Sequence, residues 1–123
     1  MAFPSRVLGA GTSGGTTTAI CGDVANTLTA TGSTQATALA LSAVFNRVST
    51  TAASTGVILP PAETGAMMVV ANDGASALQV YCQTGSTIDA VAASTGVAIA
   101  AGSRRVFFGV SPTVWVSLSA PKT

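Results

Sequence analysis

The sequence is poor in charge and contains no histidine. Only 7% of its 123 residues are Asp, Glu, Lys or Arg, and the formal net charge is +1. An average soluble domain has about 25% charged residues. Without histidine, the standard nucleophilic triads cannot form, and a zinc site would need Asp or Glu ligands. Three of the four acids, Glu63, Asp73 and Asp89, stand in ordinary loop or strand-end positions. We therefore expect no enzyme and no bound metal or cofactor.

Basic residues and long apolar runs are also scarce. The five basic residues stand at positions 6, 47, 104, 105 and 122. Neutralising a run of phosphates requires a denser array. The longest apolar stretch, residues 66–71, is far shorter than the roughly 20 residues of a membrane helix. Gly, Thr and Ser stand where a signal peptide would have its apolar core. We therefore expect no nucleic-acid or membrane partner and no export.

The chain does have enough apolar residues to fold. Hydrophobic residues make up 48% of it, and a chain of 123 residues suits one domain of ordinary size. Residues 1–18 are rich in Gly, Ser and Thr and show no sustained period, which predicts an extended N-terminal arm. We expect residues 19–123 to form a single β domain.

Short apolar or alternating runs, separated by turn residues about every ten positions, predict strands. Residues 66–71 and 78–82 flank the turn-rich segment 72–76 and predict a hairpin. Residues 105–110 and 114–118 predict a second one. Further strands are expected at 39–46, 57–59, 87–89 and 97–99. The pattern predicts an all-β fold, either a compact antiparallel β-sandwich or a Greek-key barrel.

A glycine motif near the N-terminus invites a functional interpretation. Gly9 to Gly14 has the glycine spacing of a dinucleotide-binding loop, which works only between a strand and a helix. The run Thr16 to Thr18 disfavours a helix there, so we expect no cofactor at this motif. Cys21 and Cys82 match no metal-ligand spacing and are either two buried thiols or a disulfide.

Trp115 is the only tryptophan, and it alternates with Val114 and Val116. It therefore points to the opposite face of its strand from those two residues, either as a sheet-packing residue or as a candidate interface anchor. The low charge favours the burial of much of the surface in an assembly, because a weakly charged surface rich in Ala, Ser and Thr suits close subunit packing. We expect a homo-oligomer.

The central and C-terminal sequence resembles a recurrent module of virion proteins of tailed bacteriophages. The resemblance covers most of residues 32–118 but not the first 31. The segments that carry it are 32–39, 46–48, 56–60, 65–66, 69–70, 72–74, 78–81, 84–88 and 101–102, followed by Trp115. A small free-standing copy is most similar to capsid decoration, or cement, proteins.

This resemblance implies a β-rich homotrimer on the outer surface of the phage capsid, made in the host cytoplasm and then part of the virion. Its partners would be copies of itself and the major capsid protein, and it would stabilise the shell by clamping adjacent capsomers. In that setting the N-terminal segment is either an arm that orders on the shell, with Phe3, Pro4 and Arg6 as candidate capsid contacts, or a frayed terminus.

The alternative is a tail-fibre or adhesin module that binds a host surface glycan through residues 72–76 or 111–113. Sugar-binding surfaces often carry clustered aromatics. This chain is only 5% aromatic, which favours the decoration protein.

Overall fold

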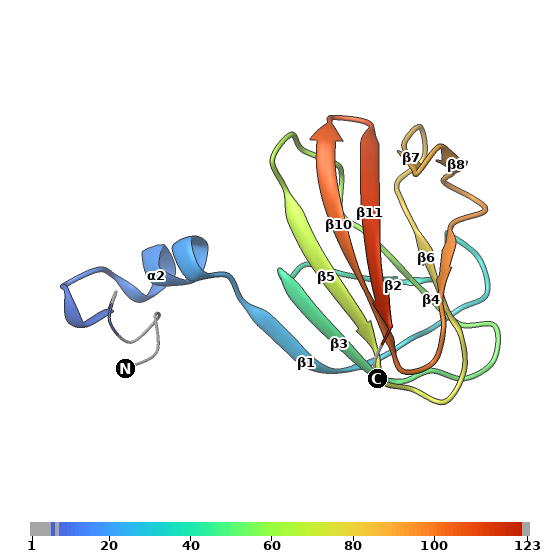
Figure 1. The fold of residues 1–123 in the computed structure, drawn as a ribbon, viewed down its shortest axis with the longest axis horizontal. Helices are drawn as coiled ribbons and strands as arrows, with labels where there is room; N and C mark the ends of the chain where they lie inside the picture. Colours follow the sequence, from blue (N-terminus) through green and yellow to red (C-terminus); the bar gives the residue numbers. More distant parts are fainter. Residues whose placement is uncertain (1–5, 7, 122–123) are drawn as a thin grey trace.

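A computed structural model of the chain describes residue 6 and residues 8–121, apart from the side chains at 18–20 and 120–121. These residues include helix α2 near the N-terminus and a body of two β-sheets (Figure 1). The elements are α2 (Gly14–Cys21), β1 (Val24–Thr29), β2 (Leu39–Ala40), β3 (Phe45–Thr50), β4 (Gly56–Ile58), β5 (Met67–Asn72), β6 (Leu78–Tyr81), β7 (Thr87–Ile88), β8 (Val91–Ala92), β9 (Val97–Ile99), β10 (Ser103–Ser111) and β11 (Val114–Pro121).

The first six strands alternate between the two sheets. Strands β1, β3 and β5 lie side by side and parallel in the larger sheet, whereas β2, β4 and β6 lie side by side and parallel in the smaller one. The chain thus passes to the other sheet at each connection, so that a strand of the larger sheet is followed three times by a strand of the smaller sheet. Parallel neighbours require such crossover connections, because a tight hairpin can join only antiparallel strands.

In the described part of the chain, the last strands add four antiparallel pairs and one parallel pair, that of β7 with β11. In the larger sheet β10 pairs with β5 and with β11, and β7 and β8 extend the sheet beyond β11. In the smaller sheet β9 pairs with β6. The full orders are β1-β3-β5-β10-β11-β7-β8 and β2-β4-β6-β9.

The hydrophobic core lies between the two sheets. Val48, Val70, Phe107 and Trp115 reach it from the larger sheet and are fully buried. The smaller sheet contributes buried residues that include Val57, Leu78, Val80 and Ile99. Alternate residues of each strand therefore face the core, as the period of two along a strand requires.

The predicted all-β class is confirmed, but the predicted antiparallel pairing is wrong for much of the body. Among the described strands, five of the nine pairings are parallel. The predicted hairpin at 105–118 is confirmed as β10–β11. Residues 39–46, expected as one strand, form β2 and the start of β3 with a bend between them.

The hairpin predicted from residues 66–82 is wrong, although both of its strands exist. Strands β5 and β6 belong to different sheets, so the partly exposed segment between them passes from one sheet to the other instead of turning back. Asn72 accounts for this crossing. Its buried side chain accepts hydrogen bonds from Thr51 Oγ1 (2.8 Å) and the Gly74 backbone N–H (3.1 Å), and donates to the carbonyls of Ser76 (2.8 Å) and Ile99 (2.9 Å).

The N-terminal segment is not extended throughout, because residues 14–21 form α2. Ser13 caps this helix: its hydroxyl accepts a hydrogen bond from the Thr16 backbone N–H (3.2 Å). The expectation that Thr16 to Thr18 would prevent a helix is therefore wrong. Figure 1 shows α2 standing apart from the two sheets, and α2 supplies no residue to the core formed by the described part of the chain.

A candidate interaction surface

The outer face of the larger sheet is apolar over most of its width. Its strands are in register, so that one row of side chains crosses five of them. The row consists of Val24 on β1, Phe45 on β3, Val69 on β5, Val106 on β10 and Leu118 on β11. No charged residue interrupts this row.

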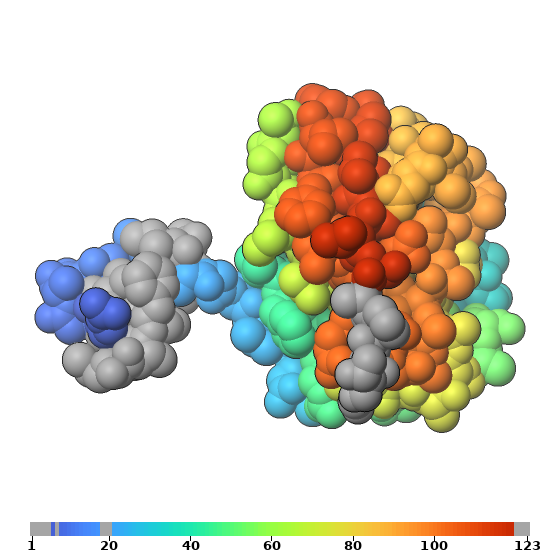
Figure 2. Space-filling model, in the orientation of Figure 1, coloured from blue at the N-terminus to red at the C-terminus, as the bar shows by residue number. Residues whose placement is uncertain are grey.

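A second, shorter row lies next to the first. Met67, Phe108 and Val116 are in register on β5, β10 and β11, and Val110 follows Phe108 on the same face of β10. We call these two rows and Val110 the outer apolar face. Figure 2 shows β10 and β11, in orange and red, at the surface of the body.

The outer apolar face is well exposed in the single chain. Leu118 is 65% exposed, Val110 52%, Met67 48% and Phe108 39%. The outer face of a two-layer β protein is normally polar, because alternation places apolar residues inward and polar residues outward. Contiguous exposed apolar surface of this kind is typical of sites that contact another molecule.

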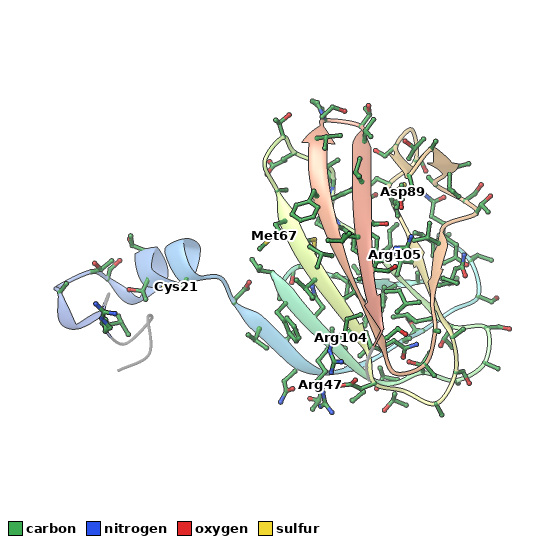
Figure 3. The ribbon with its side chains drawn as sticks, viewed as in Figure 1. Cys21, Arg47, Met67, Asp89, Arg104 and Arg105 are labelled. Atoms are coloured by element: carbon green, nitrogen blue, oxygen red, sulfur yellow. The ribbon has the colours of Figure 1, made fainter. Side chains whose placement is uncertain are left out.

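A group of charges borders this face at one end (Figure 3). Arg47 on β3 and Arg104 on β10 are in register on either side of Ala71. Both donate to the Asp73 carboxylate, Arg47 Nε at 2.7 Å and an Arg104 terminal nitrogen at 3.4 Å. Charge is thus confined to the border of the face and is partly neutralised there.

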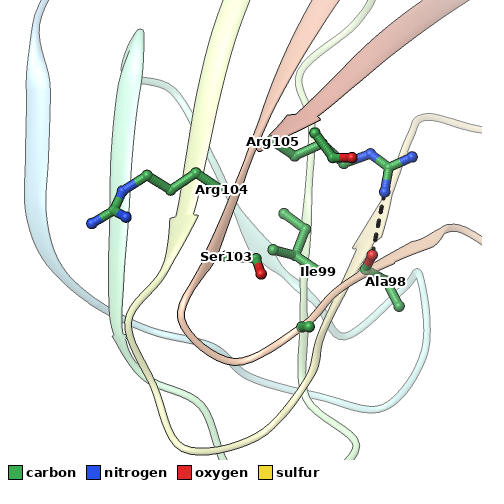
Figure 4. Close-up of a pocket in the computed structure, with 7 residues that line it drawn as sticks. Ala98, Ile99, Ser103, Arg104 and Arg105 are labelled. Carbon is green, nitrogen blue, oxygen red and sulfur yellow. Dashed lines mark hydrogen bonds between the residues drawn. The ribbon is translucent and has the colours of Figure 1, made fainter. Parts of the chain in front are cut away.

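The adjacent pair Arg104 and Arg105 diverges, because successive residues of a strand point to opposite faces. Figure 4 shows the two side chains on opposite sides of β10. Arg105 turns toward β9, where it donates to the Ala98 carbonyl (3.4 Å) beside a hollow of about 240 Å³. The pair therefore presents two separate charges and no continuous basic patch.

The Asp89 carboxylate accepts hydrogen bonds from Arg105 and Ser117 at the edge of the sheet. Partial burial raises the pKa of the Asp89 carboxyl, but hydrogen bonds from the Ser117 hydroxyl and backbone N–H, together with Arg105, outweigh this effect and lower it overall. These contacts join the β7–β8 turn to β10 and β11, which gives Asp89 a structural role.

Trp115 takes the sheet-packing position. It is 0% exposed in the single chain, so it offers no surface to a partner, and the structure favours core packing over the role of interface anchor. Its neighbour Val116 is 42% exposed on the outer apolar face. Of the candidate capsid contacts, Arg6 is exposed, whereas Phe3 and Pro4 lie outside the described residues.

Both cysteines are free thiols. Cys82 is buried in the core, and burial raises the pKa of its thiol, whereas Cys21 ends α2 and is half-buried. Of the two possibilities left by the sequence, the structure excludes the disulfide, and only Cys82 is the buried thiol that was expected.

The loop proposed for glycan binding at residues 72–76 has its main polar groups engaged within the molecule. Asn72 is 0% exposed with its side chain fully hydrogen-bonded, and Asp73 binds two arginines. At the other proposed loop, Pro112 and Thr113 are exposed. Within the described residues, no cluster of three or more potential metal ligands occurs and no helix is long and apolar enough to span a membrane.

The sequence interpretation missed the outer apolar face, although a signal for it was present. Residues 67–71 and 106–108 are apolar at successive positions, so both faces of β5 and β10 are apolar. Such continuous runs are typical of strands that are covered on both sides. The core covers only one side of these strands here.

Comparisons of this sequence with models of protein families, with curated proteins and with solved structures find no match.

Proposed function

We propose that the chain is a structural virion protein that binds the outer surface of a phage capsid as a homotrimer and stabilises the shell by clamping adjacent capsomers. The outer apolar face is the observation that carries this proposal. The resemblance of residues 32–118 to phage virion modules supports the particular setting, and the low charge supports assembly in general.

The occupant proposed for the outer apolar face is a second copy of the same chain. Because Leu118, Phe108 and Met67 carry no charge, three copies of the face can pack around a three-fold axis without electrostatic repulsion. Burial of apolar surface contributes about 25 cal/mol per Å² of area removed from water. The charged border of Arg47, Asp73 and Arg104 then remains at the rim of the contact, where solvated charges are usual in interfaces.

A trimer suits the clamping role for a physical reason. Three copies held together engage neighbouring capsomers at once, so that individually weak contacts combine through effective concentration. A molecule that binds only the closed shell also stabilises it by mass action. Capsomers that are pushed apart by packaged DNA must then break these contacts before the shell opens.

For the fold, we propose the β-sandwich in preference to the Greek-key barrel. The core lies between two sheets of unequal size, and the first six strands alternate between them in parallel. A Greek key instead begins with consecutive strands joined by hairpins.

The alternative function, a module that binds host glycan, has less support. Sugar recognition by stacking needs exposed aromatic rings, but the single Trp is fully buried and Tyr81 is 6% exposed. Phe108 is the large aromatic that is well exposed among the described residues, and aliphatic side chains surround it.

The proposal is tested on particles of the phage that encodes the chain, produced with and without it. We expect the particles that lack it to open at lower temperature and to lose DNA on osmotic shock, and we expect added purified protein to restore their resistance. Particles that resist heat and shock equally well without the protein would contradict the proposal. Binding of the protein to the tail, in a few copies per particle, would support the fibre alternative.

A further inference from the structure

We propose that the N-terminal arm, residues 6–21, of one copy docks into a hollow on the body of a neighbouring copy. This inference rests on the proposed self-association and names a second contact within it. The hollow has a volume of about 430 Å³ and lies beside the start of β5. It is lined by Ser42, Ala43, Val44, Pro60, Pro61, Glu63, Ala66, Met67, Met68 and Trp115.

The length and composition of the arm's helix indicate that it is stable only when packed against another surface. Helix α2 has only eight residues and begins with two glycines followed by three threonines. Isolated helices shorter than about 12–15 residues are marginal in water, and Gly and Thr are poor helix formers. Its own body gives α2 no place in the core, and Figure 1 shows it directed away from the sheets. A helix of this kind requires packing against another surface.

The hollow has chemistry that suits a peptide segment. The indole Nε1–H of Trp115 and Oδ1 of Asn46 are the two buried side-chain polar atoms without a hydrogen-bond partner in the described part of the chain. Trp115 lines the hollow, and Asn46 is tied through Nδ2 to the carbonyl of Ala43, another lining residue (2.7 Å). Both atoms are buried in the single chain and so lie beneath the wall of the hollow. The surface that a peptide segment meets there is mainly apolar, from residues such as Val44, Pro60 and Met67, with Glu63 as its charge.

Charge and position point to the same occupant. Glu63 is the charged residue of the hollow, and Arg6 is the charged residue of the arm, so the two carry opposite charges. Met67 belongs both to the hollow and to the outer apolar face, so a docked arm extends the proposed contact between copies. Gly22, at the root of the arm, lies against Val44, which also lines the hollow. The arm therefore starts at the rim of such a hollow on its own body and turns away from it.

Exchange of an arm from each copy to the next is a head-to-tail contact. Such contacts form a closed ring when the rotation between copies closes. An arm given to one neighbour and a hollow filled by the other is thus compatible with three identical subunits, and it binds them more tightly than the sheet contact alone.

Trp115 provides a direct reporter, because a single tryptophan gives a single indole N–H signal in an NMR spectrum. The experiment uses the full chain, a variant without residues 2–21, and a synthetic peptide of residues 2–21. We expect the peptide to shift the indole signal of the shortened variant in a saturable way. Glu63→Arg should weaken this binding by about tenfold, and a peptide with Arg6→Glu should restore it. Ser94→Lys, which adds charge to an exposed loop outside the hollow, should leave it unchanged.

Sedimentation velocity then distinguishes exchange between copies from folding back onto the same body. We expect deletion of residues 2–21 to weaken self-association by about tenfold or more. No shift of the indole signal would overturn the inference, as would peptide binding with unchanged self-association, which indicates an arm that folds back on its own hollow. If deletion of residues 2–21 leaves self-association unchanged but abolishes capsid binding, the arm docks on the shell, and this result would also overturn the inference. A full chain that stays monomeric refutes the proposed homotrimer itself.

Discussion

Phe108 lies directly opposite Val116 in the β10–β11 ladder, and both side chains are exposed, at 39% and 42%. The residues that precede them in the two strands, Phe107 and Trp115, are both 0% exposed on the other side of the sheet. The same hairpin thus carries an apolar inner face that the core covers and an apolar outer face that the single chain leaves uncovered. This difference between the two faces is the basis of the proposed contact between copies.

A charge placed in the outer apolar face should separate the copies without unfolding them. Leu118 is 65% exposed in the single chain, so Leu118→Lys removes no core contact. We expect self-association to weaken by about a hundredfold, because a buried unpaired charge is costly in an interface, and the melting temperature at low concentration to stay close to that of the unmodified chain. Sedimentation velocity and circular dichroism measure the two effects.

Thr95→Lys is the matched control for this substitution, since it adds the same charge to an exposed loop away from the face. It should leave association unchanged. Equal effects of both substitutions would mean that net charge, and not this face, governs association.

Asp89 should make part of the stability dependent on pH. Its pKa is lower in the folded chain than in the unfolded one, so its contribution is present above the unfolded value and is lost as pH falls through the folded value. We expect Asp89→Asn to lower the free energy of unfolding at pH 7 by about 1 kcal/mol, and the difference from the unmodified chain to shrink at about pH 3. Urea unfolding at both pH values measures this. A difference that is the same at both pH values would argue against an ionic role for Asp89.

Ala90 should be replaceable by glycine with a gain in stability. Asp89 and Ala90 form the two-residue turn between β7 and β8, with φ angles of 50° and 66°. Only glycine adopts such positive angles without steric cost, and Asp-Gly is a preferred sequence for two-residue hairpin turns. We expect Ala90→Gly to raise the free energy of unfolding by about 1 kcal/mol. Ala92→Gly, in the adjacent strand, should lower it, and a gain from both substitutions would contradict this explanation.

Substitution of Asn72 should lower the free energy of unfolding more than substitution of most other polar residues. Asn72→Ala removes four hydrogen bonds at a fully buried site and leaves their partners unpaired, so we expect a loss of about 3 kcal/mol in the free energy of unfolding. Thr51→Val, which removes only one of these bonds and conserves the volume, should cost about 1 kcal/mol. A loss below 1 kcal/mol for Asn72→Ala would show that the crossing between β5 and β6 does not depend on this side chain.

The sequence predicted strands better than it predicted their partners. Local alternation and turn residues located β4, β5, β6, β10 and β11 and the side of β11 from which Trp115 points. Pairing depends on contacts between distant residues, which local patterns do not contain. The loop from Asn72 to Ser76 has the composition of a hairpin turn, yet Asn72 uses its amide to bind Ile99 on another strand, and the chain crosses to the other sheet.

The six-residue sequence Ala-Ala-Ser-Thr-Gly-Val occurs twice, at residues 52–57 and 92–97, and its two copies enter different strand pairings. Each copy leads into a strand that pairs with β6, but β4 runs parallel to β6 and β9 runs antiparallel to it. The repeat is therefore a reused loop-to-strand sequence and not a duplicated unit. Both copies need their glycine, because a Cβ at Gly56 or Gly96 would lie within 3.0 Å of the Tyr81 ring.

The outer apolar face could not be predicted from the sequence for a different reason. The continuous apolar runs at 67–71 and 106–108 indicate strands covered on both sides, but they do not say what covers the second side. The sequence predicted an assembly from its low charge and from its resemblance to virion proteins, and neither locates the contact surface. Only the register of β5, β10 and β11 shows which side chains lie together on one exposed surface.

The mass of the purified chain in solution tests the central claim most directly. Sedimentation equilibrium at micromolar concentration measures it without reference to shape. The account predicts a species of three times the 12.0 kDa chain mass. A chain that remains at 12.0 kDa under these conditions would contradict it.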